Sequence, residues 1–336
     1  MLKNILIERI KKKGKIPFDE FMEVALYHPQ YGYYMIKREI GKKGDFFTSP
    51  SVSSLFSLTI AKFIERNNEK FLQDEKIQIL EIGGGKGYLM NGLIEYFDEN
   101  NPTLSKKIEF LFLELKPLLF NKRIKYIKES DLKEKSINGW IISNEFFDAL
   151  PFKRILKKDG KIYEIFIGEK NGKLFEIIDN PTSEATEFIK NFHLDSKKFE
   201  ETEINIQAYN WIKILGRALN KGYMLTIDYG EERENKNFLR KTSRSFKRHR
   251  ISDDLFDDLG NKDITSDVDF STLIKGGEEI RLKKIFLWTQ EKFLLENRIL
   301  DFKINNDISK INQLKVLLNP EFMGEKFKVL FLKKIT

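Results

Sequence analysis

Length, composition and charge limit what this chain can be. Its 336 residues suffice for one large α/β domain with an appended region, and 41% apolar residues, including 29 phenylalanines, predict a packed core. The absence of cysteine excludes disulfides, thiolate catalysis and cysteine zinc sites, and three scattered histidines do not suggest a metal site. We therefore expect no metal.

The sequence contains no secretory or membrane-spanning signal that we could identify. Its first residues, MLKNILIERIKKKGK, lack the apolar core of a signal peptide, and Glu114 and Lys116 interrupt the longest apolar stretch. We expect a cytoplasmic protein without a membrane span. The net charge of +8 reflects 59 basic and 51 acidic residues, which is typical of a well-solvated surface and can also favour acidic partners or nucleic acid.

Residues 1–70 are predicted to form a mostly helical region that precedes the main domain. One helix is expected to begin at Pro17, because proline is favoured in the first helical turn and an apolar stripe follows it. Another is expected over residues 51–65.

The loop between these two helices is rich in glycine and aromatic residues. It contains Asp45, Phe46 and Thr48, which we expect to contact the substrate, because aromatic residues in loops often touch ligands. The alternative is a loop that packs on its own aromatic side chains.

Residues 71–336, the predicted main domain, begin with a strand, a glycine turn and a helix. An alternating apolar run ends at Ile82, and apolar residues at helical spacing follow from Tyr88. Between them lie Gly83, Gly85 and Gly87. Such a turn places backbone N–H groups and the positive end of a helix dipole at the carboxyl edge of a parallel sheet, where nucleotide-like ligands bind.

Glu81 helps to identify the ligand. A carboxylate two positions before the first glycine would repel a pyrophosphate but attract the sulfonium and ammonium groups of S-adenosylmethionine. We therefore predict that Glu81 and the three glycines bind S-adenosylmethionine. A turn whose glycines only satisfy positive φ angles is the alternative.

The next strands bring further polar residues to the same edge. A strand over 108–115 ends near Glu114, a position that accepts hydrogen bonds from ribose hydroxyls in nucleoside-binding folds. A further strand is expected over 123–127 and another over 140–143.

Asn144, Glu145 and Asp148 follow the strand over 140–143 directly. We expect these side chains to hold a nitrogen nucleophile in line with the sulfonium, with Asn144 also close to the cofactor. The alternative is a helix start, with Asn144 as its cap and Asp148 on the surface.

The second half of the chain begins with a β-rich insertion at residues 152–200, which Asp-Gly and Asn-Gly turns predict to contain antiparallel hairpins. Patterns beyond it predict a helix over 202–219, core strands over 222–229 and 326–332, and a helix that starts within 263–270. The basic residues of 240–250 could bind nucleic acid or an acidic protein partner.

Eight ordered motifs then show a resemblance to a known family. They are FMEVALYHPQYGYY, GDFFTSP, LEIGGGKG, NEFFDALP, IDYG, DITSDVDF, TQEKFL and MGEKFKVL. Together they resemble the MidA-like S-adenosylmethionine-dependent methyltransferases, a family that includes the mitochondrial complex I assembly methyltransferase, a protein arginine methyltransferase. The resemblance implies an α/β fold: a Rossmann-like class I methyltransferase core with a mostly parallel sheet, an N-terminal helical region and an inserted antiparallel β segment.

The resemblance also implies where the cofactor binds, and the position of Glu145 at the strand edge suggests a mechanism. It places the cofactor on Gly83, Gly85, Gly87 and Glu114, with the NEFFDALP and GDFFTSP segments lining the site. A charged guanidinium is a poor nucleophile, so its proton must leave as the methyl group arrives. Glu145 is the first candidate for the paired carboxylate, with Asp148 or Asp45 in support and Asn144 as a positioning group.

Three functions remain open from the sequence. The first is methylation of arginine in a protein such as a respiratory complex I subunit. The second is RNA methylation, suggested by the pI of about 9.1 and the basic residues of 240–250. The third is a non-catalytic assembly chaperone that retains a cofactor pocket.

Overall fold

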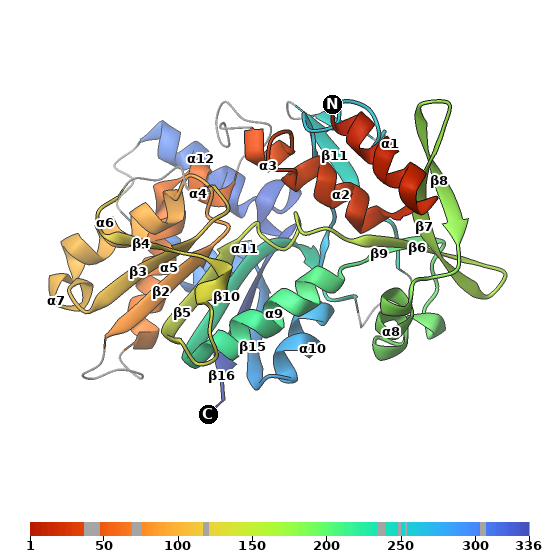
Figure 1. The fold of residues 1–336 in the computed structure, drawn as a ribbon. Helices are drawn as coiled ribbons and strands as arrows, with labels where there is room; N and C mark the ends of the chain where they lie inside the picture. Colours follow the sequence, from red (N-terminus) through yellow and green to blue (C-terminus); the bar gives the residue numbers. More distant parts are fainter. Residues whose placement is uncertain are drawn as a thin grey trace. The chain divides into compact units, whose positions relative to one another are not determined.

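The protein is represented by a computed structural model that divides into two compact units (Figure 1). The structure describes residues 1–36, 48–68, 76–116, 121–233, 239–247, 250–252, 254–302 and 307–335. Unit 1 comprises residues 1–39, 147–211 and 231–273, and unit 2 comprises residues 40–146, 212–230 and 274–336. This division follows backbone contacts and differs from the boundaries expected at residue 70 and at 152–200. The domain division stays a prediction.

Unit 2 is built on a mostly parallel sheet with the strand order β15-β16-β10-β5-β2-β3-β4 (Figure 1). The strands are β2 (Ile77–Ile82), β3 (Ile108–Leu113), β4 (Ile124–Ile127), β5 (Ile137–Asn144), β10 (Leu219–Glu231), β15 (Leu282–Thr289) and β16 (Phe327–Lys334). All neighbouring pairs from β10 to β4 are parallel, whereas β16 is antiparallel to both β10 and β15. The predicted Rossmann-like core is confirmed.

The order of connections changes direction at β2. Its chain neighbour β3 lies on one side of it and the later strand β5 on the other. In open parallel sheets, ligands bind outside the carboxyl ends of the strands at such a switch point. The glycine turn and the segment after β5 both start there, since Ile82 pairs with Leu113 and with Ser143.

Aromatic packing joins the helices of unit 2 to its sheet. The helices are α4 (Ser49–Val52), α5 (Ser54–Asn68), α6 (Tyr88–Asn100), α7 (Pro102–Ser105), α11 (Gln290–Glu296) and α12 (Ile308–Leu318). The ring of Phe63 on α5 makes edge contacts with Trp140 of β5, Phe293 of α11 and Phe331 of β16. The Trp140 indole also donates a hydrogen bond of 2.7 Å to Asn68. These buried contacts fix α5 against the sheet.

Unit 1 combines helices with antiparallel strands. Its elements are α1 (Leu2–Lys13), β1 (Ile16–Pro17), α2 (Phe18–Tyr27), α3 (Tyr33–Ile36), β6 (Lys153–Lys158), β7 (Lys161–Lys170), β8 (Lys173–Asp179), α8 (Ser183–Asn191), β9 (Glu201–Ile204), β11 (Arg244–Lys247), β12 (Arg250–Ser252) and β13 (Asp263–Thr265). One sheet contains β1, β6, β7, β8 and β9, and a smaller one has the order β12-β11-β13. The predicted N-terminal helices and antiparallel β segment are confirmed.

The two predicted hairpins of unit 1 form where the sequence places them. Asp159 and Gly160 join β6 to β7, and Asn171 and Gly172 join β7 to β8. All four residues have positive φ angles between 50° and 75°, as a two-residue type I′ turn requires.

Elsewhere the structure differs from the predicted elements. The helix expected over 202–219 begins only at Ile206, as α9 (Ile206–Ala218), because Glu201–Ile204 pair with β6 instead. The helix expected to start within 263–270 does start in that range, at Phe270, as α10 (Phe270–Glu278), and the short strands β13 and β14 (Val268–Asp269) precede it. Strand pairing therefore overrides local helical spacing at the start of the segment 202–219. In the described stretches, no helix combines the length and apolarity needed to cross a bilayer.

Strands β5 and β10 pair at a point where two glycines approach each other closely. Gly139 and Gly222 are opposite each other in the parallel register and have φ angles of 139° and 141°. A Cβ atom at Gly222 would overlap the carbonyl oxygen of Gly139. The backbone conformation and the lack of space both require glycine here.

We expect Gly222→Ala to lower the free energy of unfolding by about 3 kcal/mol, through steric overlap and backbone strain. Urea unfolding followed by circular dichroism measures the change. Gly277→Ala is the matched control, because Gly277 lies in α10 with only ordinary van der Waals contacts around its Cβ position. A Gly222→Ala protein as stable as this control would contradict the packing described here.

Candidate active site

The glycine turn after β2 is tightly defined. Gly83, Gly85 and Gly87 have φ angles of 64°, 54° and 69°, a region that L side chains rarely adopt. The Gly83 N–H donates to the carbonyl of Leu113, and Gly87 is the residue from which α6 starts. A Cβ atom at Gly83 would approach the Phe146 ring to 2.7 Å. The turn and the segment after β5 are therefore in direct contact.

Glu81 lies beneath this turn with its side chain buried. Only 2% of the residue is exposed, and its Oε2 has no hydrogen-bond partner among the described residues. Burial is the main reason that the pKa of Glu81 is raised from 4.5 to about 8; a backbone hydrogen bond from Met90 lowers it, and the charge of Glu114 raises it. A buried carboxyl group with an unused oxygen is suited to a cationic group.

Gly84 is required because its neighbours leave no space for a side chain. A Cβ atom at Gly84 would come within 2.5 Å of the Glu81 carboxyl group and within 2.6 Å of the Phe112 ring. A side chain at this position would therefore displace the buried acid.

Glu114 follows β3 and binds the turn itself. Its Oε2 accepts a hydrogen bond of 2.9 Å from the Gly85 N–H, and its Oε1 accepts one of 2.7 Å from the Leu115 N–H. Each carboxylate oxygen has two lone pairs, so both can still accept hydrogen bonds from hydroxyl groups. The acid predicted for the ribose is thus positioned by the same turn that was predicted to bind the rest of the cofactor.

Asn144 and Glu145 lie where β5 ends. Glu145 has a φ angle of 53°, which is unusual for a residue with a side chain, and its N–H donates to the carbonyl of Ile227 on β10. The Asn144 amide donates a hydrogen bond of 3.0 Å to the Glu145 carboxylate. Asn144 itself is buried, and its Oδ1 has no hydrogen-bond partner in the described part of the chain. Non-glycine residues with such backbone conformations are often found at functional sites.

Two buried residues that the sequence analysis did not select hold this carboxylate in place. The Ser49 N–H, at the start of α4, contacts Glu145 Oε1 at 3.4 Å. The Ser49 hydroxyl donates to Gln290 Oε1 at 2.8 Å, and the Gln290 amide donates to the carbonyl of Leu317 at 3.0 Å. Ser49 and Gln290 are both 0% exposed. Ser49 lies within the GDFFTSP motif and Gln290 within the TQEKFL motif. Membership of these motifs was the only feature of the sequence that could have pointed to the two residues.

The roles of the other predicted site residues stay predictions. Thr48 precedes α4, and its backbone N–H and carbonyl both bond the Ser51 hydroxyl. Asp45 and Phe46 lie outside the described residues. Asp148 belongs to unit 1, where its backbone carbonyl accepts from Ser266. Its charge adds to the burial that raises the pKa of Tyr34.

The arrangement in unit 2 fits S-adenosylmethionine. The fit rests on the unpartnered oxygens of Glu81 and Asn144, which can accept from an ammonium group, and on a turn with no room for side chains at Gly83 and Gly84. Glu114 remains available to hydroxyl groups. These features lie on neighbouring strands, at the ends where the switch point predicts a ligand.

Comparison with known proteins supports the same chemistry. A curated protein of Xenopus laevis, "Protein arginine methyltransferase NDUFAF7, mitochondrial", is 29% identical to this chain over 97% of it and 83% of its own length. The protein of the same name from Xenopus tropicalis is 28% identical over 97% and 84%. A crystal structure from Burkholderia thailandensis with bound S-adenosyl-homocysteine has a TM-score of 0.84 and 23% identity, and covers 99% of this chain and 92% of that one.

One expectation is wrong by this comparison. The chain was expected to be cytoplasmic, but the curated relatives are named as mitochondrial proteins. The lack of an apolar signal-peptide core could not decide the point, because mitochondrial targeting segments are amphipathic and basic rather than apolar.

Residues 56–286, more than half of the chain, match a family model described as "Putative S-adenosyl-L-methionine-dependent methyltransferase". This match confirms the resemblance seen in the motifs and agrees with the geometry of the glycine turn. The chain belongs to this family of S-adenosyl-L-methionine-dependent methyltransferases.

Proposed function

We propose that this methyltransferase acts on an arginine side chain of a protein, with a subunit of respiratory complex I as the candidate target. The observation that carries the proposal is the Glu145 carboxylate, held at the sheet edge by Asn144 and Ser49. The names of the curated relatives, protein arginine methyltransferases, support the same substrate class.

The chemistry of arginine explains why a fixed carboxylate is needed. S-adenosylmethionine supplies an electrophilic methyl group when it is bound. The guanidinium of the substrate is charged at neutral pH and carries no free lone pair, so a proton must leave the attacking nitrogen. Glu145 pairs with the guanidinium, orients it and takes that proton. Asn144 Oδ1 accepts one of the remaining N–H groups of the substrate or the ammonium of the cofactor.

Glu81 and Glu114 bind rather than react in this proposal. Glu81, ionised when a cation is present, would hold the ammonium end of the cofactor, and Glu114 would accept the ribose hydroxyls. The glycine turn brings the backbone close to the ligand. Phe146, against Gly83, excludes water from the same edge.

Binding of S-adenosylmethionine is expected to release a proton from Glu81. Its pKa is about 8 in the free protein, and a bound cation lowers it, so below pH 8 the carboxyl group must ionise on binding. The affinity should therefore rise with pH, by up to about tenfold per unit, and level off above pH 8. Calorimetry at pH 7 in buffers of different ionisation enthalpy measures the proton release.

The Glu81→Gln protein should show neither the proton release nor this pH dependence. Glu109→Gln serves as the matched control, because Glu109 lies on β3 near the opposite end of the strand, and hydrogen bonds already lower its pKa. Wild-type binding without proton release would refute a cation site at Glu81.

Replacement of Glu145 by glutamine should separate binding from catalysis. Glu145→Gln keeps the hydrogen-bonding shape but cannot take a proton, so methyl transfer should fall by at least about 100-fold while S-adenosylmethionine binds normally. Transfer of labelled methyl groups to lysate proteins, separated from RNA, measures the loss. Glu95→Gln, at an exposed position of α6, is the control. Full activity of Glu145→Gln would exclude the proposed role, and label confined to the RNA fraction would exclude a protein substrate.

Gln290 is expected to act as a positioning residue through Ser49. Gln290→Met preserves the side-chain length but removes both hydrogen bonds, so Ser49 and Glu145 should lose their fixed positions. We expect kcat to fall about tenfold with little change in KM for S-adenosylmethionine. Gln313→Met on α12 provides the comparison. A rise in KM with unchanged kcat would instead indicate a cofactor-binding role.

A further inference from the structure

Unit 1 contains a basic cavity that the proposed chemistry does not use. Its volume is about 370 Å³, and the walls include Arg240, Lys241 and Arg244, with Asp267 as the acidic lining residue. Thr242 and Ser243 form the wall between the basic residues. Residues 240–244 of its lining belong to the basic stretch 240–250 noted in the sequence. Arg248 and His249 of that stretch lie outside the described residues.

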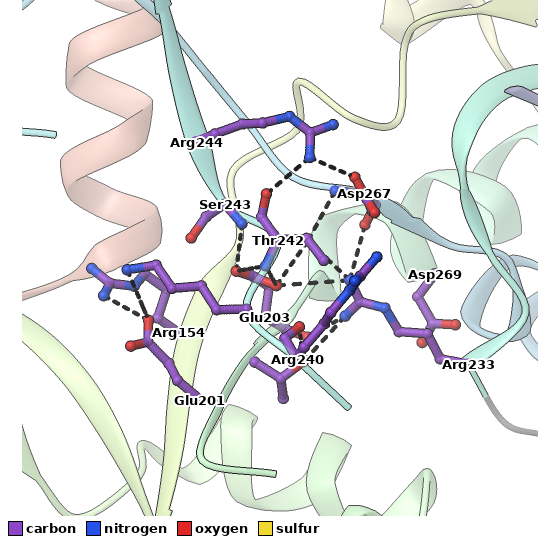
Figure 2. Close-up of polar contacts among 12 residues, drawn as sticks. Arg154, Glu201, Glu203, Arg233, Arg240, Thr242, Ser243, Arg244, Asp267 and Asp269 are labelled. Atoms are coloured by element: carbon purple, nitrogen blue, oxygen red, sulfur yellow. Dashed lines mark hydrogen bonds and ion pairs between the residues drawn. The ribbon is translucent and has the colours of Figure 1, made fainter. Parts of the chain in front are cut away.

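A buried ion pair fixes the backbone of this wall (Figure 2). Glu203, 6% exposed, accepts hydrogen bonds from the backbone N–H groups of Thr242 at 2.9 Å and Ser243 at 2.7 Å, and from the Thr242 hydroxyl at 3.0 Å. Arg233 lies 3.7 Å from Glu203 and also donates to the Thr242 hydroxyl. The segment is therefore held before any ligand arrives, which lowers the entropy cost of binding.

The charges of the cavity are only partly neutralised. Arg244 pairs with Asp267 at 2.8 Å and so fixes the wall. Lys241 lies 3.5 Å from Glu201, but Glu201 already pairs with the buried Arg154 at 2.6 Å. Lys241 remains 41% exposed. Arg240 is exposed, and its guanidinium makes no ion pair with any residue that the structure describes.

One polar group of the wall is buried without a described partner. The Ser243 hydroxyl is shielded from solvent, yet it has no hydrogen-bond partner within the described ranges. Buried polar groups without a partner are uncommon, and this one lies in a residue that lines the cavity. An acceptor oxygen placed in the cavity would face the cations of Arg240 and Lys241.

The lining favours carboxylates over nucleic acid. Proteins that bind single-stranded nucleic acid combine basic grooves with aromatic side chains on which bases stack, and among the described residues that line this cavity none is aromatic. A few carboxylates of a peptide match both the limited charge and the limited volume.

We propose that this cavity binds an acidic segment of the protein substrate, with its carboxylates at Arg240 and Lys241. This inference rests on the proposed function for its choice of a protein substrate. The binding event itself needs no methyl transfer, so the two proposals can fail separately.

The test uses three fluorescein-labelled probes with the full-length protein. The first probe is a peptide of about 15 residues, on the order of a short binding segment, with one arginine between glutamates. The second probe is the same peptide with glutamines in place of the glutamates. The third probe is single-stranded RNA. Fluorescence anisotropy should show tighter binding of the acidic peptide than of the neutral one. Arg240→Gln with Lys241→Gln should weaken the acidic peptide about fivefold or more and leave the neutral peptide unchanged.

Lys11→Gln with Lys12→Gln is the matched control, because both lysines are exposed on α1 of the same unit and the change in net charge is equal. S-adenosylmethionine binding, measured on each variant, should stay constant and so report separately on the methyltransferase site. Equal affinity for acidic and neutral peptides would overturn the inference. Equal weakening by the two double variants, or a loss confined to RNA, would overturn it as well.

Discussion

The buried carboxyl group of Glu81 is the constraint on which the proposed cofactor site depends. It occupies the space that a side chain at Gly84 would need, and its charge is coupled to that of Glu114 on the neighbouring strand. Glu114 in turn binds the Gly85 N–H. The turn, the two acids and the first two strands therefore form one structure, and a change in any of them alters the others.

Long-range contacts fix the part of the candidate site that follows β5. Glu145 is fixed by neighbours in the chain, Asn144 and the pairing of β5 with β10, and by the distant pair Ser49 and Gln290. Unit 1 uses a similar device, because the Glu203 and Arg233 ion pair fixes the backbone at Thr242. In both units a buried polar contact, and not an apolar one, sets the position of a segment that carries charge.

The sequence predicts local features well and distant pairings poorly. The glycine turn, the hairpin turns at Asp159 and Asn171 and the core strands follow from spacing and residue type, which depend on a few neighbours. Pairing across 241 residues between Ser49 and Gln290 has no such local signal. The strand at Glu201–Ile204 was missed for the same reason, since its conformation is set by its partner β6. Nor does a sequence show that Glu114 binds the turn.

The position of β16 has a consequence for biosynthesis. This strand follows both β10 and β15 along the chain, yet it lies between them in the sheet and pairs with both. During translation, β10 and β15 are both complete before the strand that joins them has left the ribosome. Their exposed edges then need protection, because unpaired strand edges promote aggregation. The sheet of unit 2 therefore closes only after β16 has been synthesised.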